Sequence, residues 1–213
     1  MNIKQFLYKY KHAIVVLYFP IYMTWFVLLE KRTNVHFTDI HCIVDDWIPF
    51  NEIFIIPYLL WFLYVFVVLA FLFFQTDHIN DFYHTAAVLI FGMTTSLLIY
   101  TIFPNMQSMR PTSFDRDNVF LRIITILYKT DTDTNVLPSI HVFNSLAIHA
   151  GVCRCYAFQK HKWIRVVSLI LCSLICLSTM FLKQHSFLDV VAAFALFLLI
   201  EHLVERFLVK PAK

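Results

Sequence analysis

Ile53-Phe-Ile-Ile-Pro-Tyr-Leu-Leu-Trp-Phe-Leu-Tyr-Val-Phe-Val-Val-Leu-Ala-Phe-Leu-Phe-Phe74 is an uninterrupted apolar run without a charged side chain. About 20 residues of helix cross the hydrocarbon core of a bilayer, so this run is long enough to span a membrane. The whole chain has the same character, because 60% of its 213 residues are hydrophobic and only 15% are charged. A soluble domain of this length carries more charge. We therefore predict an integral membrane protein.

Five further apolar runs surround this one. Three of them carry no charge, and two are interrupted by a few ionisable residues: Ala13–Leu29, Thr85–Phe103 and Val166–Leu182, then Ile140–Phe158 and Phe187–Val209. We predict an all-α fold in which six transmembrane helices form one bundle, as a single domain over residues 1–213. The long loop Pro104–Ser139 then joins the third and fourth helices. Within it, Val119–Tyr128 is apolar but too short to span, which predicts a short helix along the membrane surface.

Lysine and arginine set the expected orientation, since they concentrate in cytoplasmic loops. With a cytoplasmic N-terminus, the inner segments hold 10 of the 17 Lys and Arg residues. We therefore expect both termini in the cytoplasm, the long loop outside, and residence in the cell membrane. The net charge of +3 suits contact with anionic lipid headgroups and gives no indication of nucleic-acid binding. The five cysteines show no metal-ligand spacing and are expected to be packing residues.

Ionisable residues gather in three short stretches at the edges of apolar runs. These stretches are Arg110-Pro111, then Pro138-Ser139-Ile140-His141, then Lys183-Gln184-His185 with Asp189 four residues later. The predicted topology places all three on the outer face. Because ionisable groups are costly near lipid, such residues indicate a functional site. Two histidines, a carboxylate and cations together favour phosphoryl transfer.

The second stretch has the features of a helix start. Proline ends the loop and Ser139 is suited to cap the helix, whose first N–H groups then favour an anion. His141 would lie in the first turn, where it could donate a proton to a leaving oxygen. The alternative is an ordinary helix start with an interfacial histidine.

The third stretch pairs a histidine with a carboxylate. At a spacing of four, His185 and Asp189 would share one face of a helix. A carboxylate bonded to one imidazole nitrogen leaves the other nitrogen free as a nucleophile. Lys183 could bind phosphate, and Arg110 offers bidentate recognition of phosphate oxygens. The alternatives are an interfacial histidine–carboxylate pair and an ordinary interfacial arginine.

These three stretches, in this order, resemble the motifs of the type 2 phosphatidic acid phosphatase superfamily, over roughly Asp45 to Ala193. The resemblance implies a six-helix membrane core, a phosphohistidine on His185 oriented by Asp189, and protonation of the leaving oxygen by His141. It also implies phosphate binding by Arg110, Ser139 and Lys183 and substrate contact by Ile140, with no metal and no cofactor. The string Asn135-Val-Leu-Pro-Ser-Ile-His-Val142 is similar to the branch close to the inositol phosphorylceramide synthases.

The chain departs from the family pattern at three positions. Most members have Lys where this chain has Phe103, Gly where it has Ile140, and an Arg where Thr179 stands. Two of the usual phosphate-binding cations are thus absent from their usual positions. Lys183 is the expected replacement for one, with Arg122 or Lys129 delivered by the long loop.

The sequence leaves three hypotheses for function. The first is hydrolysis of a lipid phosphate or diphosphate at the outer face. The second keeps the same residues but transfers the phosphoryl or phosphoalcohol group to a lipid hydroxyl, which Ile140 and the branch resemblance favour. The third is a lipid-binding or carrier protein without catalysis. The expected partners are a phosphorylated lipid and membrane lipid, and the oligomeric state stays open.

Overall fold

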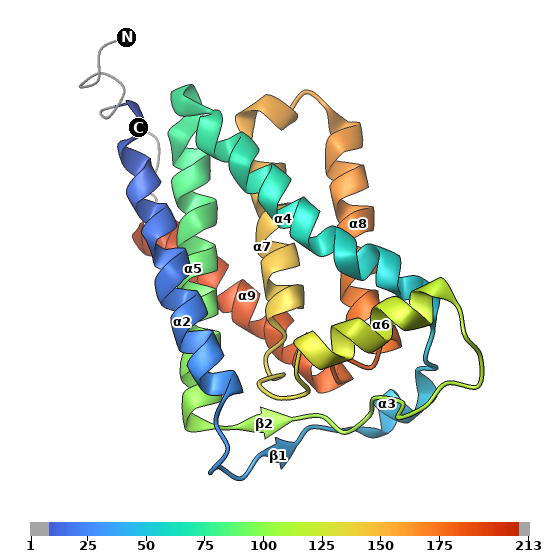
Figure 1. The fold of residues 1–213 in the computed structure, drawn as a ribbon. Coiled ribbons are helices and arrows are strands. Elements are labelled where there is room, and N and C mark those ends of the chain that lie inside the picture. Colours follow the sequence, from blue (N-terminus) through green and yellow to red (C-terminus); the bar gives the residue numbers. More distant parts are fainter. Residues whose placement is uncertain (1–8, 209–213) are drawn as a thin grey trace.

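The computed structural model describes residues 9–208 of the chain. It is an all-α protein with a single two-residue strand pair among these residues. Figure 1 shows the helices gathered into one bundle. The α-helices are α2 Tyr18–Glu30, α3 Ile43–Trp47, α4 Ile55–Phe74, α5 Ile79–Ile102, α6 Val119–Thr130, α7 Ile140–Arg154, α8 Lys162–Phe181 and α9 Phe187–Phe207. The strands are β1 Thr38–Asp39 and β2 Asn105–Met106, and short 3-10 turns cover Lys11–Leu17, Glu52–Phe54, Thr76–His78 and Tyr156–Phe158.

Five helical segments are long and apolar enough to cross a membrane, judged by length and composition: Lys11–Glu30, Glu52–Phe74, Thr76–Ile102, Lys162–Phe181 and Phe187–Phe207. Their number indicates a multi-pass membrane protein. The helix at the remaining predicted span is α7, which has 15 residues and is not among the five. The chain termini, expected in the cytoplasm, lie outside the described residues.

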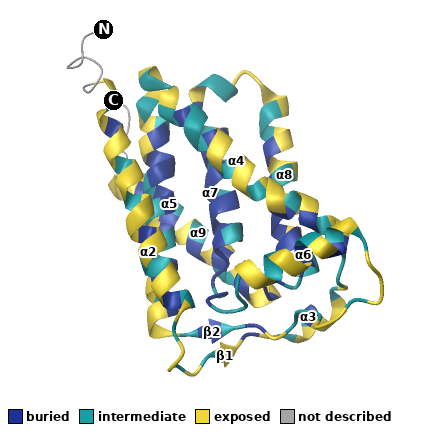
Figure 2. Cartoon of the chain, viewed as in Figure 1, coloured by how far each residue is buried: buried dark blue, intermediate teal, exposed yellow. Residues whose placement is uncertain are grey.

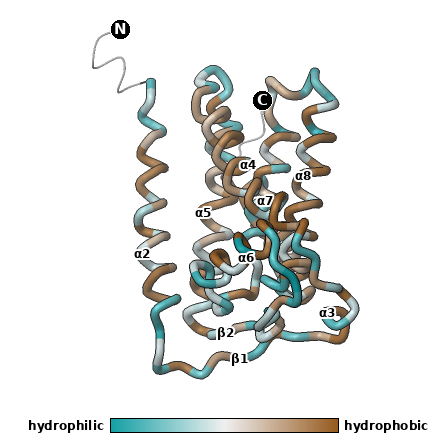
Figure 3. The backbone as a smooth tube through the Cα atoms, turned by 45° about the vertical axis from the view of Figure 1, so that its right-hand side comes forward, coloured by the Kyte–Doolittle hydropathy of each residue, from teal (hydrophilic) through white to brown (hydrophobic). Residues whose placement is uncertain are grey.

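α7 forms the centre of the bundle. It packs against α4, α5, α8 and α9, and Figure 2 shows it buried along most of its length. Its Val142, Phe143 and Ile148 have no exposed surface. The outer helices instead expose large apolar side chains, such as Ile21 of α2 and Phe66 of α4, at 65% and 70%. Figure 3 shows hydrophobic residues along the helices and hydrophilic ones at their ends. Apolar side chains on the outer surface of the helices, with hydrophilic residues at the helix ends, are expected for a bundle surrounded by lipid.

The two glycines of the chain both lie where α5 and α7 approach each other. A Cβ atom built at Gly92 of α5 would fall 1.8 Å from the ring of Phe143. One built at Gly151 of α7 would fall 2.6 Å from the Thr85 hydroxyl. One glycine on each helix therefore permits the close contact of α5 with the central helix.

The connecting segments β1, β2, α3 and α6 gather at one end of the bundle, away from the first described residues (Figure 1). β1 and β2 pair in parallel, with Thr38 opposite Asn105. The segment between α5 and α7 contains β2 and the short helix predicted at Val119–Tyr128, which is present as α6. Leu121 and Ile124 of α6 pack with Leu182 at the end of α8, and this contact positions the loop over the helix ends.

Candidate active site

Two histidines meet at this end of the bundle. His141 lies in the first turn of α7, and His185 lies just before α9. The distance from Nε2 of His185 to Nδ1 of His141 is 3.4 Å. His185 is buried, and His141 is partly buried. The structure therefore brings together the two imidazoles that sequence reasoning placed in one site.

Asp189 holds the ring of His185. One oxygen of this fully buried carboxylate, Oδ2, lies 3.2 Å from Nδ1 of His185 and accepts the N–H of Ser186 at 2.8 Å. Ser186 caps α9, and Asp189 completes a capping box. The pair is thus close because of a cap turn. It does not share a helix face, as its spacing had suggested, since His185 precedes the cap.

The start of α7 is fixed from two sides. The Asn105 side-chain oxygen accepts the N–H groups of Val136 and Leu137, both at 2.8 Å, and the Tyr100 hydroxyl donates to the Pro138 carbonyl at 2.5 Å. The Ser139 hydroxyl then caps the helix by accepting the N–H of Val142 at 3.3 Å. The predicted capping role of Ser139 is confirmed, and these contacts determine where His141 stands.

Tyr58 and Asp131 extend the histidine pair. The Tyr58 hydroxyl lies 3.0 Å from Nε2 of His141 and donates to Oδ2 of Asp131 at 2.6 Å. The ring of Trp61 lies 4.5 Å from that of His141, and its buried indole N–H has no hydrogen-bond partner among the described residues. Sequence reasoning missed these residues. Their only signals are a tyrosine beside Pro57 in an apolar run and an aspartate at the polar end of the loop.

Arg110 is held beside this group by the loop. Its guanidinium donates to the carbonyls of Asp131 at 2.8 Å and Thr132 at 2.7 Å, and it also bonds the side-chain oxygen of Gln184. It stacks over the Tyr128 ring at 4.8 Å. Because Gln184 precedes His185 directly, Arg110 is coupled to the histidine pair through one amide side chain.

Three buried N–H donors in this region lack an acceptor among the described residues. They are Nε of Arg110 and the side-chain nitrogens of Gln107 and Gln184. The backbone N–H of Gln107 bonds the Asp133 carbonyl, so its donor belongs to the same loop as the carbonyls that hold Arg110. An unmatched buried donor costs about 1–3 kcal/mol. A ligand that brings hydrogen-bond acceptors would remove this cost, and Arg110 and Gln184 already contact each other.

Ile140 and Lys183, also predicted as binding residues, contact other groups. Ile140 is buried against Leu97 and Tyr100 in an apolar cluster. The Lys183 ammonium donates to the carbonyls of Asp45 at 2.7 Å and Ile48 at 2.5 Å. Burial lowers the pKa of Lys183, although the charges of Asp45 and Asp46 oppose that change.

The other candidate cations lie at the surface of α6. Arg122 is exposed and pairs with Asp117 at 2.5 Å, and Lys129 is exposed as well. Thr179, where the resembled family has arginine, is buried and its hydroxyl bonds the Cys176 carbonyl at 2.8 Å. Neither surface cation is placed at the histidine pair in this structure.

Comparisons of the chain with protein-family models, with curated proteins and with solved structures find no match.

Proposed function

We propose that this protein is a metal-independent membrane phosphatase that hydrolyses a lipid phosphate or diphosphate through a phosphohistidine on His185. The observation that carries the proposal is the continuous chain Asp189–His185–His141–Tyr58–Asp131, with successive contacts between 2.6 and 3.4 Å. A carboxylate, a nucleophilic nitrogen and a second titratable ring are the groups that this reaction needs. The motif resemblance described above and the apolar surface of the helices support a lipid substrate.

The proposal requires that α7 cross the membrane as a sixth span. A helix of 15 residues is about 22 Å long, less than the hydrocarbon core. The neighbours of α7 are other helices, so its ends meet protein rather than lipid. With six crossings, the histidine pair faces outward and both termini face the cytoplasm.

The pattern of hydrogen-bond donors and acceptors supports His141 as the general acid that protonates the leaving oxygen. Tyr58 donates to Asp131, so its oxygen accepts from Nε2–H of His141, while Asp189 accepts from Nδ1–H of His185. The facing atoms, Nδ1 of His141 and Nε2 of His185, then both carry lone pairs. One further proton between them completes the chain. That proton is the one a leaving oxygen would receive.

The chemistry follows from these positions. Substrate binding would part the two rings, and Nε2 of His185 would attack phosphorus. The N–P bond forms as the P–O bond to the lipid breaks, and His141 gives its proton to the leaving oxygen. Water then attacks phosphorus, His141 accepts a proton from that water, and the N–P bond breaks to release phosphate.

Neutral amides would take the place of the two cations that the resembled family has. The unmatched donors of Gln107, Arg110 and Gln184 can bond the nonbridging oxygens as charge develops in the transition state. Lys183 is left out of this set, because its hydrogen bonds to Asp45 and Ile48 tie it to the α3 segment. The substrate would thus be held by one positive charge and several neutral donors.

The first test measures phosphate release by purified protein from phosphatidate, polyprenyl diphosphate, phosphatidylglycerol phosphate and sphingoid phosphates. With the best substrate, labelled in the phosphate, wild-type protein should form an acid-labile covalent adduct. His185→Ala should abolish both turnover and the adduct, because the attacking nitrogen is gone. His141→Ala should lower turnover by about 10²–10⁴-fold, the usual contribution of a general acid.

His41→Ala is the matched control, since His41 also pairs with a carboxylate, Asp46 at 2.8 Å, but at an exposed position. It should behave as wild type. An adduct that persists in a folded His185→Gln variant would overturn the assignment. Repeating the assay with a lipid alcohol present separates hydrolysis from transfer, because a transferase yields a new phospholipid in place of free phosphate.

A further inference from the structure

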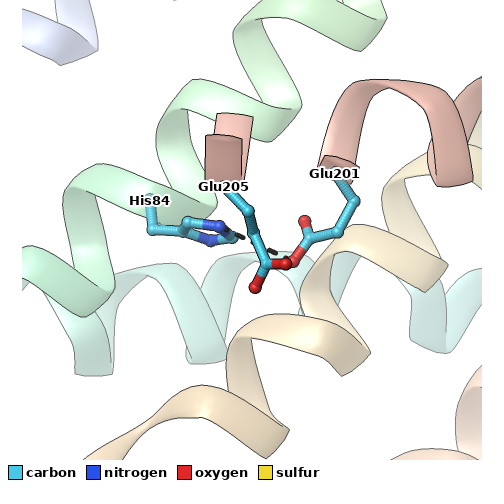
Figure 4. A group of neighbouring side chains, drawn as sticks. All are labelled: His84, Glu201 and Glu205. Carbon is cyan, nitrogen blue, oxygen red and sulfur yellow. Dashed lines mark ion pairs between the residues drawn. The ribbon is translucent and has the colours of Figure 1, made fainter. Parts of the chain in front are cut away.

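A second cluster of ionisable groups lies far along the bundle from the histidine pair. His84 comes from the N-terminal part of α5, and Glu201 and Glu205 come from the last turns of α9. Figure 4 shows the imidazole and the two carboxylates turned toward one another. His84 is far in sequence from the two glutamates, which are four residues apart on one helix, so no local spacing predicts a metal site.

The geometry of this cluster is close to that of a metal centre. Nε2 of His84 lies 3.6 Å from a carboxylate oxygen of Glu201, and one ligand atom from each of the three residues lies within 4.8 Å of the others. In a tetrahedral zinc site with bonds of about 2.0–2.2 Å, neighbouring ligand atoms are about 3.4 Å apart. The His84–Glu201 separation of 3.6 Å is close to this spacing, and the ligand oxygen of Glu205 lies within 4.8 Å of both.

The cluster is also unsatisfied. The His84 side chain is only 3% exposed, yet its Nε2 has no hydrogen-bond partner among the described residues. The same holds for the buried second oxygen of Glu201. Glu205 is paired with Arg154 at 2.8 Å, while the ion-pair partner of Glu201 among the described residues is His84. A cation bound between Nε2 of His84 and the Glu201 carboxylate would accept lone pairs from both and so satisfy these buried atoms.

We propose that His84, Glu201 and Glu205 bind a divalent transition-metal ion, with zinc as the best-suited ion. A mixed nitrogen and oxygen ligand set of this kind favours zinc over magnesium or calcium, which prefer oxygen alone. Three protein ligands leave a fourth position for water. The ion would join the start of α5 to the end of α9 and neutralise the excess negative charge.

The test is zinc binding by the full-length protein, purified in detergent and stripped with a chelator. Wild type should bind one equivalent of Zn²⁺. Size-exclusion chromatography should show that the protein is folded under the same conditions. Glu201→Gln keeps the side-chain shape but removes a charged ligand, so the affinity should fall at least about tenfold. Zinc should also raise the thermal unfolding temperature of wild type more than that of Glu201→Gln.

Asp46→Asn is the matched control, because it removes a carboxylate from the exposed His41–Asp46 pair, which belongs to no group of three candidate metal ligands among the described residues. It should bind zinc as wild type does. Since metal ligands must be deprotonated, affinity should weaken as the pH falls toward 5. Absence of one tight equivalent in wild type would overturn the proposal. So would equal affinity in wild type, Glu201→Gln and a folded His84→Gln variant.

Discussion

A single oxygen of Asp189 serves both the fold and the proposed chemistry. Oδ2 accepts the N–H of Ser186, which starts α9, and lies against Nδ1 of His185. Asp45 reinforces the same turn from another segment, because it accepts the Ser186 hydroxyl at 2.6 Å and the N–H of Phe187 at 2.7 Å. At the scale of the residue, His185, the proposed nucleophile, is therefore placed by two buried carboxylates on one helix cap.

Replacing Asp45 tests this arrangement through its pH dependence. Burial raises the pKa of Asp45, but hydrogen bonds from Ser186, Phe187 and Cys42 outweigh that effect and hold it below its ordinary value. A depressed folded-state pKa stabilises the protein above the unfolded value of about 3.9, and this contribution is lost as the pH falls through the folded pKa. Asp45→Asn should therefore lower the free energy of unfolding by about 1–3 kcal/mol at neutral pH.

The measurement is thermal unfolding of wild type and Asp45→Asn from about pH 7 down to about pH 3. The difference between them should stay constant above about pH 5 and shrink below about pH 4. Asp46→Asn, at an exposed neighbouring carboxylate, should show little change at any pH. A difference that persists undiminished at about pH 3 would contradict the role given to the Asp45 charge.

The site residues that could be predicted from the sequence are those whose partners are close to them in the chain. Ser139 was expected as a cap because proline and serine before an apolar run are typical of a helix start. The His185–Asp189 pairing was expected from spacing, although a cap turn and not a helix face produces it. Tyr58 was out of reach, because its contact with His141 depends on how α4 packs against α7. No local pattern encodes such a contact.

At the scale of the element, α7 shows that the length of an apolar run in the sequence is a poor guide to the bounds of a central helix. Hydropathy predicted a run through Phe158, but the helix ends at Arg154 and Cys155 leads into a 3-10 turn. A helix enclosed by protein needs no uniform apolar surface, and α7 buries Asn144 and Ser145 as well as Phe143. The sequence therefore predicted the outer, lipid-facing helices better than the enclosed one.

Gly92→Ala tests the contact between α5 and α7. The added methyl group would overlap the ring of Phe143, which is fully buried and packed in the core, so the helices must separate. We expect a loss of about 1–3 kcal/mol in the free energy of unfolding, as is typical of overpacking. Thr95→Ala on the same helix is the control, because the Thr95 hydroxyl bonds the Phe91 carbonyl of its own helix. Adding Phe143→Leu should restore part of the loss, and a Gly92→Ala protein as stable as the control would contradict the close contact.

At the scale of the whole molecule, polar groups are divided between two ends of an apolar bundle. The histidine pair, α3 and α6 lie at one end, while His84 and the turns Thr76–His78 and Tyr156–Phe158 belong to the other helix ends. In the proposed orientation, which follows the Lys and Arg bias, the second end faces the cytoplasm. The proposed site lies on a single face of the membrane, with the second end on the opposite face, only if α7 crosses.

Cysteine labelling tests that crossing. In a background without the five native cysteines, single cysteines would replace Asn34, Asp77, Ser113 and Gln159, all at exposed positions. Positions 34 and 113 should react with an impermeant thiol reagent on intact cells, because they belong to the end that carries the histidine pair. Positions 77 and 159 should react only after permeabilisation. The pair 113 and 159 is decisive, since α7 is the only described helix of more than 12 residues between them. If both were labelled from the same side, α7 would not cross, and the shared site of His141 and His185 on an outer face would have to be abandoned.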